Sequence, residues 1–159
     1  MIRFSLVLTA ALFPFAATAE TQLERLEVIS EQMNDAMFDA MIRMVENEGG
    51  NPEPLREKVP DSAWNDEYRD AGACMLDRFT EASSAGAVDD MLDKMEAFIP
   101  QLANMDLDAM GQDNDFLPEG ISEDFSIQVN EECGLTDLML DRMEQSGFMA
   151  AMMQSMAGN

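Results

Sequence analysis

Residues 21–52 read TQLERLEVISEQMNDAMFDAMIRMVENEGGNP, the pattern of one long amphipathic helix with a marked start and stop. Thr21 and Glu24 form a capping box, in which each side chain satisfies a free backbone amide of the first turn. Apolar residues then recur at steps of three and four, which places them on one helix face: Leu26, Ile29, Met33, Ala36, Met37, Ala40, Met41 and Met44. Gly49 and Pro52 predict where this helix stops.

Further stretches with helical spacing extend this prediction along the chain. A second helix opens at Pro60, and a third ends or kinks at Pro100. A short helix follows the N-cap residue Ser122, and Gly134 either separates it from the last segment, 135–157, or bends one long helix. No segment alternates apolar and polar residues with the period of a strand. We therefore expect an all-α protein of four or five helices in an antiparallel bundle, stapled by one disulfide.

One local pattern occurs three times in the chain. It reads Met-Leu-Asp-Arg-Phe at 75–79, Met-Leu-Asp-Lys-Met at 91–95 and Met-Leu-Asp-Arg-Met at 139–143. On a helix, the first, second and fifth residues face the core, and the Asp and the basic residue point outward. The unequal spacing of the copies indicates reuse of an amphipathic turn and not a duplicated module.

The first residues predict an export signal. Arg3 precedes an apolar run that is too short to span a bilayer, and small residues follow it at the exit. We expect residues 1–19 to be a signal peptide, cleaved between Ala19 and Glu20, and residues 20–159 to form a single helical domain. No second apolar run approaches the ~20 residues of a membrane helix, so we expect a periplasmic or secreted protein without membrane insertion after cleavage.

The charge of the chain restricts its partners. Lys and Arg number 9 against 32 Asp and Glu, which gives a formal net charge of −23. Such a surface repels phosphate backbones and anionic lipid headgroups, so nucleic acid and membrane surfaces are not expected partners. Cationic peptides, polyamines, basic proteins and divalent cations remain open, as does a role of the charge in solubility or in salty water.

The chain has two cysteines, Cys74 and Cys133. An even number in an exported protein predicts a structural disulfide, and closing so long a loop stabilises the fold by roughly 4 kcal/mol in the chain-entropy model. Free thiols and a pairing between chains are the alternatives. The spacing excludes a thioredoxin-like CxxC motif.

The absence of histidine restricts the chemistry. It removes the commonest general base and the commonest transition-metal ligand, and it excludes Ser–His and Cys–His nucleophile pairs. No Gly-rich phosphate loop is present either. We expect no catalytic residue and no cofactor, and a hydrolase built on carboxylates alone is the enzyme that the sequence leaves open.

Methionine is the unusual enrichment, with 16 residues in the chain. Two groups of four share helix faces: Met33, Met37, Met41 and Met44, and Met149, Met152, Met153 and Met156. Core packing is one use of such a face, and soft thioether ligation of Cu(I) is a second. A third use is an adaptable surface for apolar partner segments, for which 148–156 is the best candidate because it has few charges.

These observations predict an exported, acidic, non-catalytic interaction module whose partner is another protein or peptide. The alternative is a periplasmic metal-binding protein that holds Cu(I) through methionines or Ca²⁺ weakly in the acidic loop 104–115. That loop does not fit the EF-hand template in either of two registers. The sequence leaves the oligomeric state open.

Overall fold

The computed structural model describes residues 20–102 and 116–157, and every regular element in this part of the chain is a helix. The described helices are α1 (Gln22–Asn47), α2 (Glu53–Arg56), α3 (Asp66–Ala82), α4 (Ala85–Leu102), α5 (Glu123–Glu132), α6 (Leu135–Ser146) and α7 (Phe148–Ala157). The all-α prediction is confirmed, whereas the predicted number of four or five helices is wrong. None of these helices carries an apolar stretch of the length that a membrane crossing needs.

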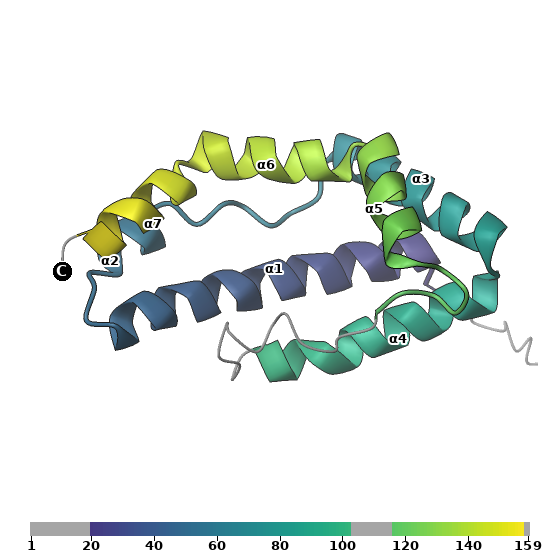
Figure 1. Ribbon diagram of the computed structural model, residues 1–159, viewed down its shortest axis with the longest axis horizontal. Coiled ribbons are helices and arrows are strands. Elements are labelled where there is room, and N and C mark those ends of the chain that lie inside the picture. Colours follow the sequence, from purple (N-terminus) through teal and green to yellow (C-terminus); the bar gives the residue numbers. More distant parts are fainter. Residues whose placement is uncertain (1–19, 103–115, 158–159) are drawn as a thin grey trace, which may run out of the picture.

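Helix α1 runs along most of the length of the molecule (Figure 1) and begins where the capping box predicts. The Thr21 hydroxyl accepts a hydrogen bond from the Glu24 backbone N–H at 3.2 Å, and the Glu24 carboxylate accepts one from the Thr21 N–H at 2.8 Å. This bond from the Thr21 N–H, and a second from the Thr21 hydroxyl to the same carboxylate at 2.9 Å, lower the pKa of Glu24 because they favour its charged form. Just beyond the other end, Gly49 adopts a φ of +80° that a side chain would disfavour.

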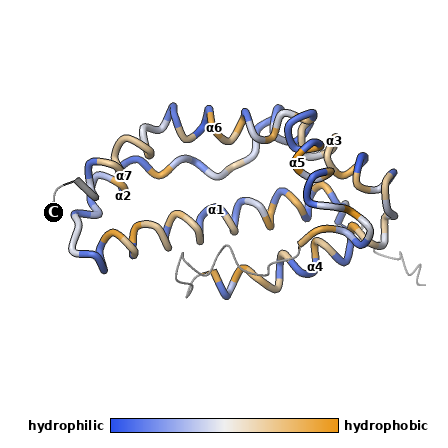
Figure 2. Tube along the Cα trace, in the orientation of Figure 1, coloured by the Kyte–Doolittle hydropathy of each residue, from blue (hydrophilic) through white to orange (hydrophobic). Residues whose placement is uncertain are grey.

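Two hydrophobic cores lie along α1, and hydrophobic residues recur over its whole length (Figure 2). The first core joins the N-terminal half of α1 to α3, α4 and α5, and its buried residues are Leu26, Ile29, Trp64, Tyr68, Leu76, Phe79, Val88, Met91, Leu92 and Val129. The second joins the C-terminal half of α1 to α2 and α7 through Phe38, Ile42, Val45, Leu55, Phe148 and Ala151. The core-facing stripe of α1 therefore changes direction midway along the helix.

Helix α6 bridges the two ends of the molecule above the segment that joins α2 to α3 (Figure 1). Gly134 and Gly147 adopt φ values of +80° and +75° at its two ends, and these left-handed residues separate α6 from α5 and α7. The sequence predicted a break or bend at Gly134 and missed the one at Gly147. Helix α6 packs on α3, α5 and α7, and none of its residues is fully buried. Packing of the helices as an antiparallel bundle stays a prediction.

Two other predicted helix boundaries can be compared with the structure. Helix α3 begins at Asp66 and not at Pro60, because Asn65 caps it by accepting the Tyr68 N–H at 3.0 Å. Helix α4 contains Pro100 and continues to Leu102, so of the two predicted outcomes, an end or a kink at the proline, the end is excluded. A proline inside a helix removes one i→i−4 hydrogen bond, and the burial of the Leu102 side chain favours the continuation.

The start of α5 and the disulfide follow the predictions. Ser122 caps α5 by accepting the Phe125 N–H at 3.2 Å. Cys74 of α3 and Cys133 at the end of α5 form an intrachain disulfide, with their Cα atoms 5.7 Å apart. An exposed ion pair of 2.9 Å between Arg78 of α3 and Glu132 of α5 lies beside this junction. The junction holds the α5 end, and therefore the start of α6, against α3.

Candidate functional site

A groove of about 280 Å³ lies between α1 and α6, and residues 61–64, between α2 and α3, contribute to its wall. We call it the α1–α6 groove. Its apolar lining comes from Met37, Phe38, Trp64, Leu135, Met139 and Met143. Two charged side chains, Asp61 and Arg142, and the phenol of Tyr68 also line it. Uncharged polar residues complete the lining: Ser30, Asn34, Ser62, Asn130 and Thr136. The groove thus combines apolar side chains with polar groups that can orient a ligand, as binding sites do.

Two hydrogen bonds hold the segment 61–64 against α1. The backbone N–H of Trp64 donates to Glu31 at 2.8 Å, and the Ser62 hydroxyl donates to Asp35 at 2.6 Å. Both carboxylates lie on α1, far away in sequence, which is why the local pattern around Pro60 could not show this arrangement. The bonds fix the wall of the groove in place.

Gly72 allows the indole of Trp64 to pack directly on α3. A Cβ atom at this position would lie 2.6 Å and 2.7 Å from two ring atoms of Trp64, well inside van der Waals contact. A glycine inside a helix weakens the helix, and here it permits this close contact. The glycine therefore brings Trp64 next to Tyr68, whose ring centre lies 6.0 Å from that of the indole.

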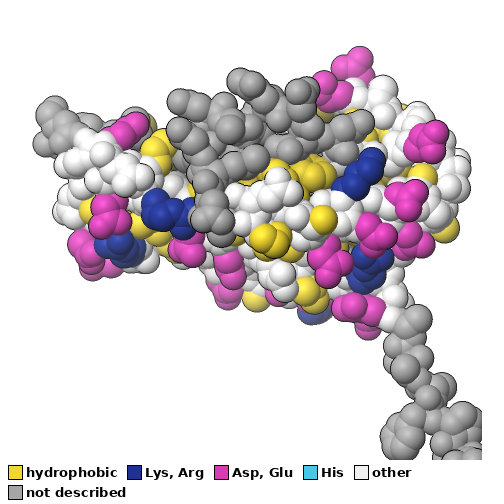
Figure 3. Space-filling view, turned by 90° about the horizontal axis from the view of Figure 1, so that it is seen from below, with side chains coloured by type: hydrophobic (Ala, Val, Ile, Leu, Met, Phe, Trp, Pro, Cys, Tyr) yellow, Lys and Arg dark blue, Asp and Glu magenta, His cyan; other side chains and the backbone are white. Residues whose placement is uncertain are grey.

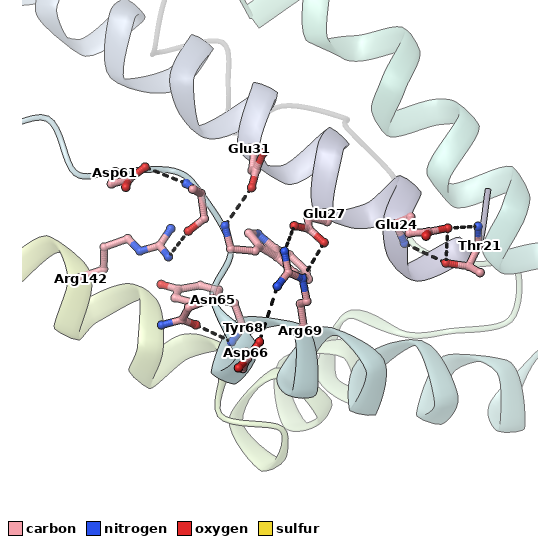
Figure 4. A network of polar contacts seen from close by, with 12 residues as sticks. Thr21, Glu24, Glu27, Glu31, Asp61, Asn65, Asp66, Tyr68, Arg69 and Arg142 are labelled. Carbon is pink, nitrogen blue, oxygen red and sulfur yellow. Dashed lines mark hydrogen bonds and ion pairs between the residues drawn. The ribbon is translucent and has the colours of Figure 1, made fainter.

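Arg142 joins α6 to the rest of the site (Figure 4). Its Nη2 atom donates to the carbonyl oxygen of Ala63 at 2.9 Å, and its guanidinium carbon lies 3.9 Å from the centre of the Tyr68 ring. A guanidinium over an aromatic face is attracted by the ring quadrupole. Arg142 thereby ties α6 both to the segment 61–64 and to α3.

Tyr68 and Arg142 each have a buried donor atom that makes no hydrogen bond within the described part of the chain. These atoms are the hydroxyl of Tyr68 and Nη1 of Arg142. Tyr68 is only 8% exposed, and burial raises the pKa of its hydroxyl, so the group keeps its proton at neutral pH. Buried polar groups without a partner are uncommon in folded proteins and call for an explanation.

The role of Arg142 contradicts the prediction from the repeated Met-Leu-Asp-Arg pattern. In the copy at 139–143 the basic residue points inward onto Tyr68, while Met139 and Leu140 are exposed. One sequence signal does distinguish this copy. Arg142 has no acidic residue three or four positions away on its helix, whereas the first two copies have such a partner for their basic residue.

The two methionine-rich segments divide between packing and exposure. On α1, Met33 packs against the first core, and Met37 and Met41 pack against the second, as the amphipathic spacing predicted. In the candidate surface 148–156, Phe148 is fully buried and Met153 is 68% exposed. Helix α7 is therefore part of the second core on one side and exposes methionine on the other.

Several predicted features lie wholly or partly outside the described residues. The acidic loop 104–115 lies entirely outside them, and so does the signal peptide 1–19 with Ala19 of the predicted cleavage site, although Glu20 is described. Within the described ranges, no group of three or more Asp, Glu or Cys side chains is placed to hold a metal ion. The Cu(I) hypothesis depends on thioethers instead, three of which line the α1–α6 groove: Met37, Met139 and Met143.

The surface is acidic with apolar patches. On the face shown in Figure 3, Asp and Glu side chains lie around exposed apolar side chains, and Lys and Arg are few. This agrees with the formal charge of −23 for the whole chain. A ligand that approaches the protein therefore meets a negative potential before it reaches any apolar surface.

Comparison of this chain with protein-family models, with curated proteins and with solved structures finds no match.

Proposed function

We propose that this protein is an exported, non-catalytic binding protein that takes an apolar segment of another protein or peptide into the α1–α6 groove. The observation that carries the proposal is the groove's lining, in which methionine and aromatic side chains surround a hollow of about 280 Å³. Ligand pockets for whole small molecules begin at roughly this volume and extend to about 1,000 Å³, so this groove fits the side chains of one short segment.

The chemistry of the lining supports binding over catalysis. Methionine is unbranched and polarisable, so it adapts to apolar groups of varied shape. Asp61 is the one carboxylate among the described residues that line the groove, whereas hydrolysis by carboxylates alone takes a pair. The exposed side chain of Leu140 adds apolar surface on α6 next to Met139 of the groove.

A panel of short, N-terminally labelled peptides that carry two lysines and end in two apolar residues tests the proposal. The lysines keep the peptides soluble and match the acidic surface. We expect Kd values in the micromolar range for part of the panel, measured by fluorescence anisotropy, and a loss of about tenfold or more in the variant Met139→Glu, which puts a charge into the groove.

The matched control is Met153→Glu, because Met153 is exposed on α7 and does not line the groove. We expect its affinities to stay within about twofold of the parent protein, since it changes the net charge by the same amount at a distance from the site. Absence of binding across the whole panel, or equal losses in both variants, would contradict the proposal.

Cu(I) binding is the second candidate function. It is favoured by the three thioethers of Met37, Met139 and Met143, which come from two helices and line the same groove. Thioethers are soft ligands that suit Cu(I). The oxidising compartment to which an exported protein is delivered is also where copper is handled. A titration with Cu(I) distinguishes this function from peptide binding.

A further inference from the structure

We propose that Tyr68 and Arg142 bind the C-terminal carboxylate of the segment that enters the α1–α6 groove. This inference rests on the proposed function and names the chemistry of the partner: a free chain end whose last side chains are apolar. Four observations about the site lead to it.

The first is the lack of an ion pair at Arg142. The arginines at positions 25, 56, 69 and 78 each contact a carboxylate, at distances between 2.6 Å and 2.9 Å for their shortest pairs. Arg142 makes no such contact within the described part of the chain, although the chain has 32 acidic residues. Arg43 makes none either, but it is exposed to water, whereas Arg142 is half-buried. A partly buried cation without a counter-charge is costly and favours an anionic ligand.

The second observation is the hydroxyl of Tyr68. It is buried and protonated, it makes no hydrogen bond to a described residue, and it belongs to the ring that carries the Arg142 guanidinium. The site thus offers two donors, Oη of Tyr68 and Nη1 of Arg142. A carboxylate has about four lone-pair positions, so one such group accepts from both.

The third observation concerns access. Both donor atoms are covered in the structure, but the Arg142 side chain is only half-buried and borders a second hollow of about 490 Å³ on α6 and the segment 60–65. Binding of a carboxylate requires the Arg142 side chain to turn away from the Tyr68 ring and from the Ala63 carbonyl oxygen, so that the two donor atoms face the hollow. The aromatic ring stays in place, because the packing of Trp64 and the Asn65 cap hold the start of α3.

The fourth observation selects the kind of anion. Asp61 lines the same groove, and Glu67 and Asp141 line the second hollow next to it. These carboxylates disfavour free, multiply charged anions such as phosphate. A peptide C-terminus carries a single charge, its apolar side chains match the methionines of the groove, and basic residues upstream match the acidic surface. Capture of a terminal carboxylate by converging donors is a known mode of peptide recognition.

The test compares one peptide, Lys-Lys-Gly-Ala-Leu-Phe, as the free acid and as the C-terminal amide. Both forms have the same apolar side chains, so the groove contacts are constant and only the terminal charge changes. We expect the purified, disulfide-bonded parent protein to prefer the acid by about tenfold or more, as charge-assisted hydrogen bonds at a half-buried site allow.

Two variants assign that preference to the two residues. Arg142→Gln should lower the ratio of acid to amide affinities from about tenfold toward one, because it removes the positive charge that only the acid pairs with. Tyr68→Phe removes only the hydroxyl and keeps the ring under Arg142, so it should reduce the ratio part of the way. Circular dichroism melting of both variants checks their folding, and Tyr68→Phe keeps the proposal falsifiable if Arg142→Gln does not fold.

The outcomes separate this inference from the proposed function. Equal affinity of the parent for acid and amide would overturn the carboxylate site and leave groove binding intact. A preference for the acid that persists in Arg142→Gln would overturn the assignment to Arg142. Absence of binding for both forms and for the whole peptide panel would overturn the proposed function itself. If the fatty acid decanoate binds and no peptide does, the peptide as the carrier of the carboxylate would be overturned.

Discussion

Residues 91–95 of α4 and residues 139–143 of α6 have nearly the same sequence, Met-Leu-Asp-Lys-Met and Met-Leu-Asp-Arg-Met, and opposite environments. Leu92 is fully buried, whereas Leu140 is 57% exposed. The basic residue is exposed in the first copy, whereas Arg142 is half-buried over an aromatic ring. An amphipathic pattern predicts which residues share a helix face, and the neighbouring elements determine which face is covered.

The neighbours of the two helices explain the difference. Helix α4 packs along α1 and α3 and contributes to the first core. Helix α6 lies between two cores and has no fully buried residue. Partly buried side chains pack it on both cores, Leu135 and Leu138 on the first and Met143 on the second, and the disulfide junction and Arg142 add to these contacts. A helix held in this way leaves apolar side chains available to a partner.

The largest expected effect comes from the junction that holds α6. Replacing both cysteines, Cys74→Ser with Cys133→Ser, removes a cross-link across a sequence separation of 59 residues. The chain-entropy model predicts a loss of about 4 kcal/mol in the free energy of unfolding, an upper figure because strain in the native bond is ignored. Urea denaturation measures this loss, and hydrogen exchange should show that amides of α6 lose more protection than those of α4.

The parent protein itself provides the control for this prediction. Under denaturing, non-reducing conditions it should present no free thiol to a thiol reagent. Titration of two thiols per chain would contradict the disulfide, and equal loss of protection in α4 and α6 would contradict the special dependence of α6 on the junction.

The next effect compares the two copies of the pattern directly. Leu92→Ala should lower the free energy of unfolding by about 3 kcal/mol, because it leaves a cavity in the first core. Leu140→Ala should change it by less than about 0.5 kcal/mol, since the side chain is exposed. Similar losses at both positions would show that the apolar face of α6 is covered by neighbours as that of α4 is. This would contradict the difference in environment between the two copies.

The local features of this fold could be predicted from the sequence, and the site could not. The caps at Thr21 and Ser122 depend on residues within one helical turn, so the local pattern shows them. The α1–α6 groove depends on contacts between distant segments, such as the bond from Trp64 to Glu31. Arg142 was predicted to point outward because its partner, the Tyr68 ring, is also distant in sequence. Pairing of Cys74 with Cys133 is the long-range contact that composition and compartment did predict.

A smaller effect is expected where methionine packs against a core. Replacing Met37 and Met41 together by Leu conserves volume and removes two sulfurs, so we expect a change below about 1.5 kcal/mol per site in the free energy of unfolding. A Cu(I) titration of the same variant tests the alternative function, because Met37 lines the groove. Tight, stoichiometric Cu(I) binding that disappears in this variant would make metal handling the leading function.

The smallest effect concerns salt, and here the sign is the prediction. The folded chain concentrates a formal net charge of −23, and salt near 0.1 M limits the reach of these charges to about 10 Å. The melting temperature should therefore rise between low salt and moderate NaCl. A value that stays flat or falls would show that local ion pairs outweigh the repulsion.

Hydrogen exchange at the two salt concentrations shows whether salt has the larger effect on α4 or on α6. Arg25 pairs with Asp93 across α1 and α4, and Arg69 pairs with Glu27 across α3 and α1, so salt weakens contacts there while it relieves repulsion. Helices α6 and α7 contribute no ion pair within the described part of the chain, so relief of repulsion is the dominant effect on them. Added salt should protect the amides of α6 more than those of α4. The reverse order would mean that charge contacts hold α6 in place. The way α6 is anchored would then not explain why its apolar face is exposed.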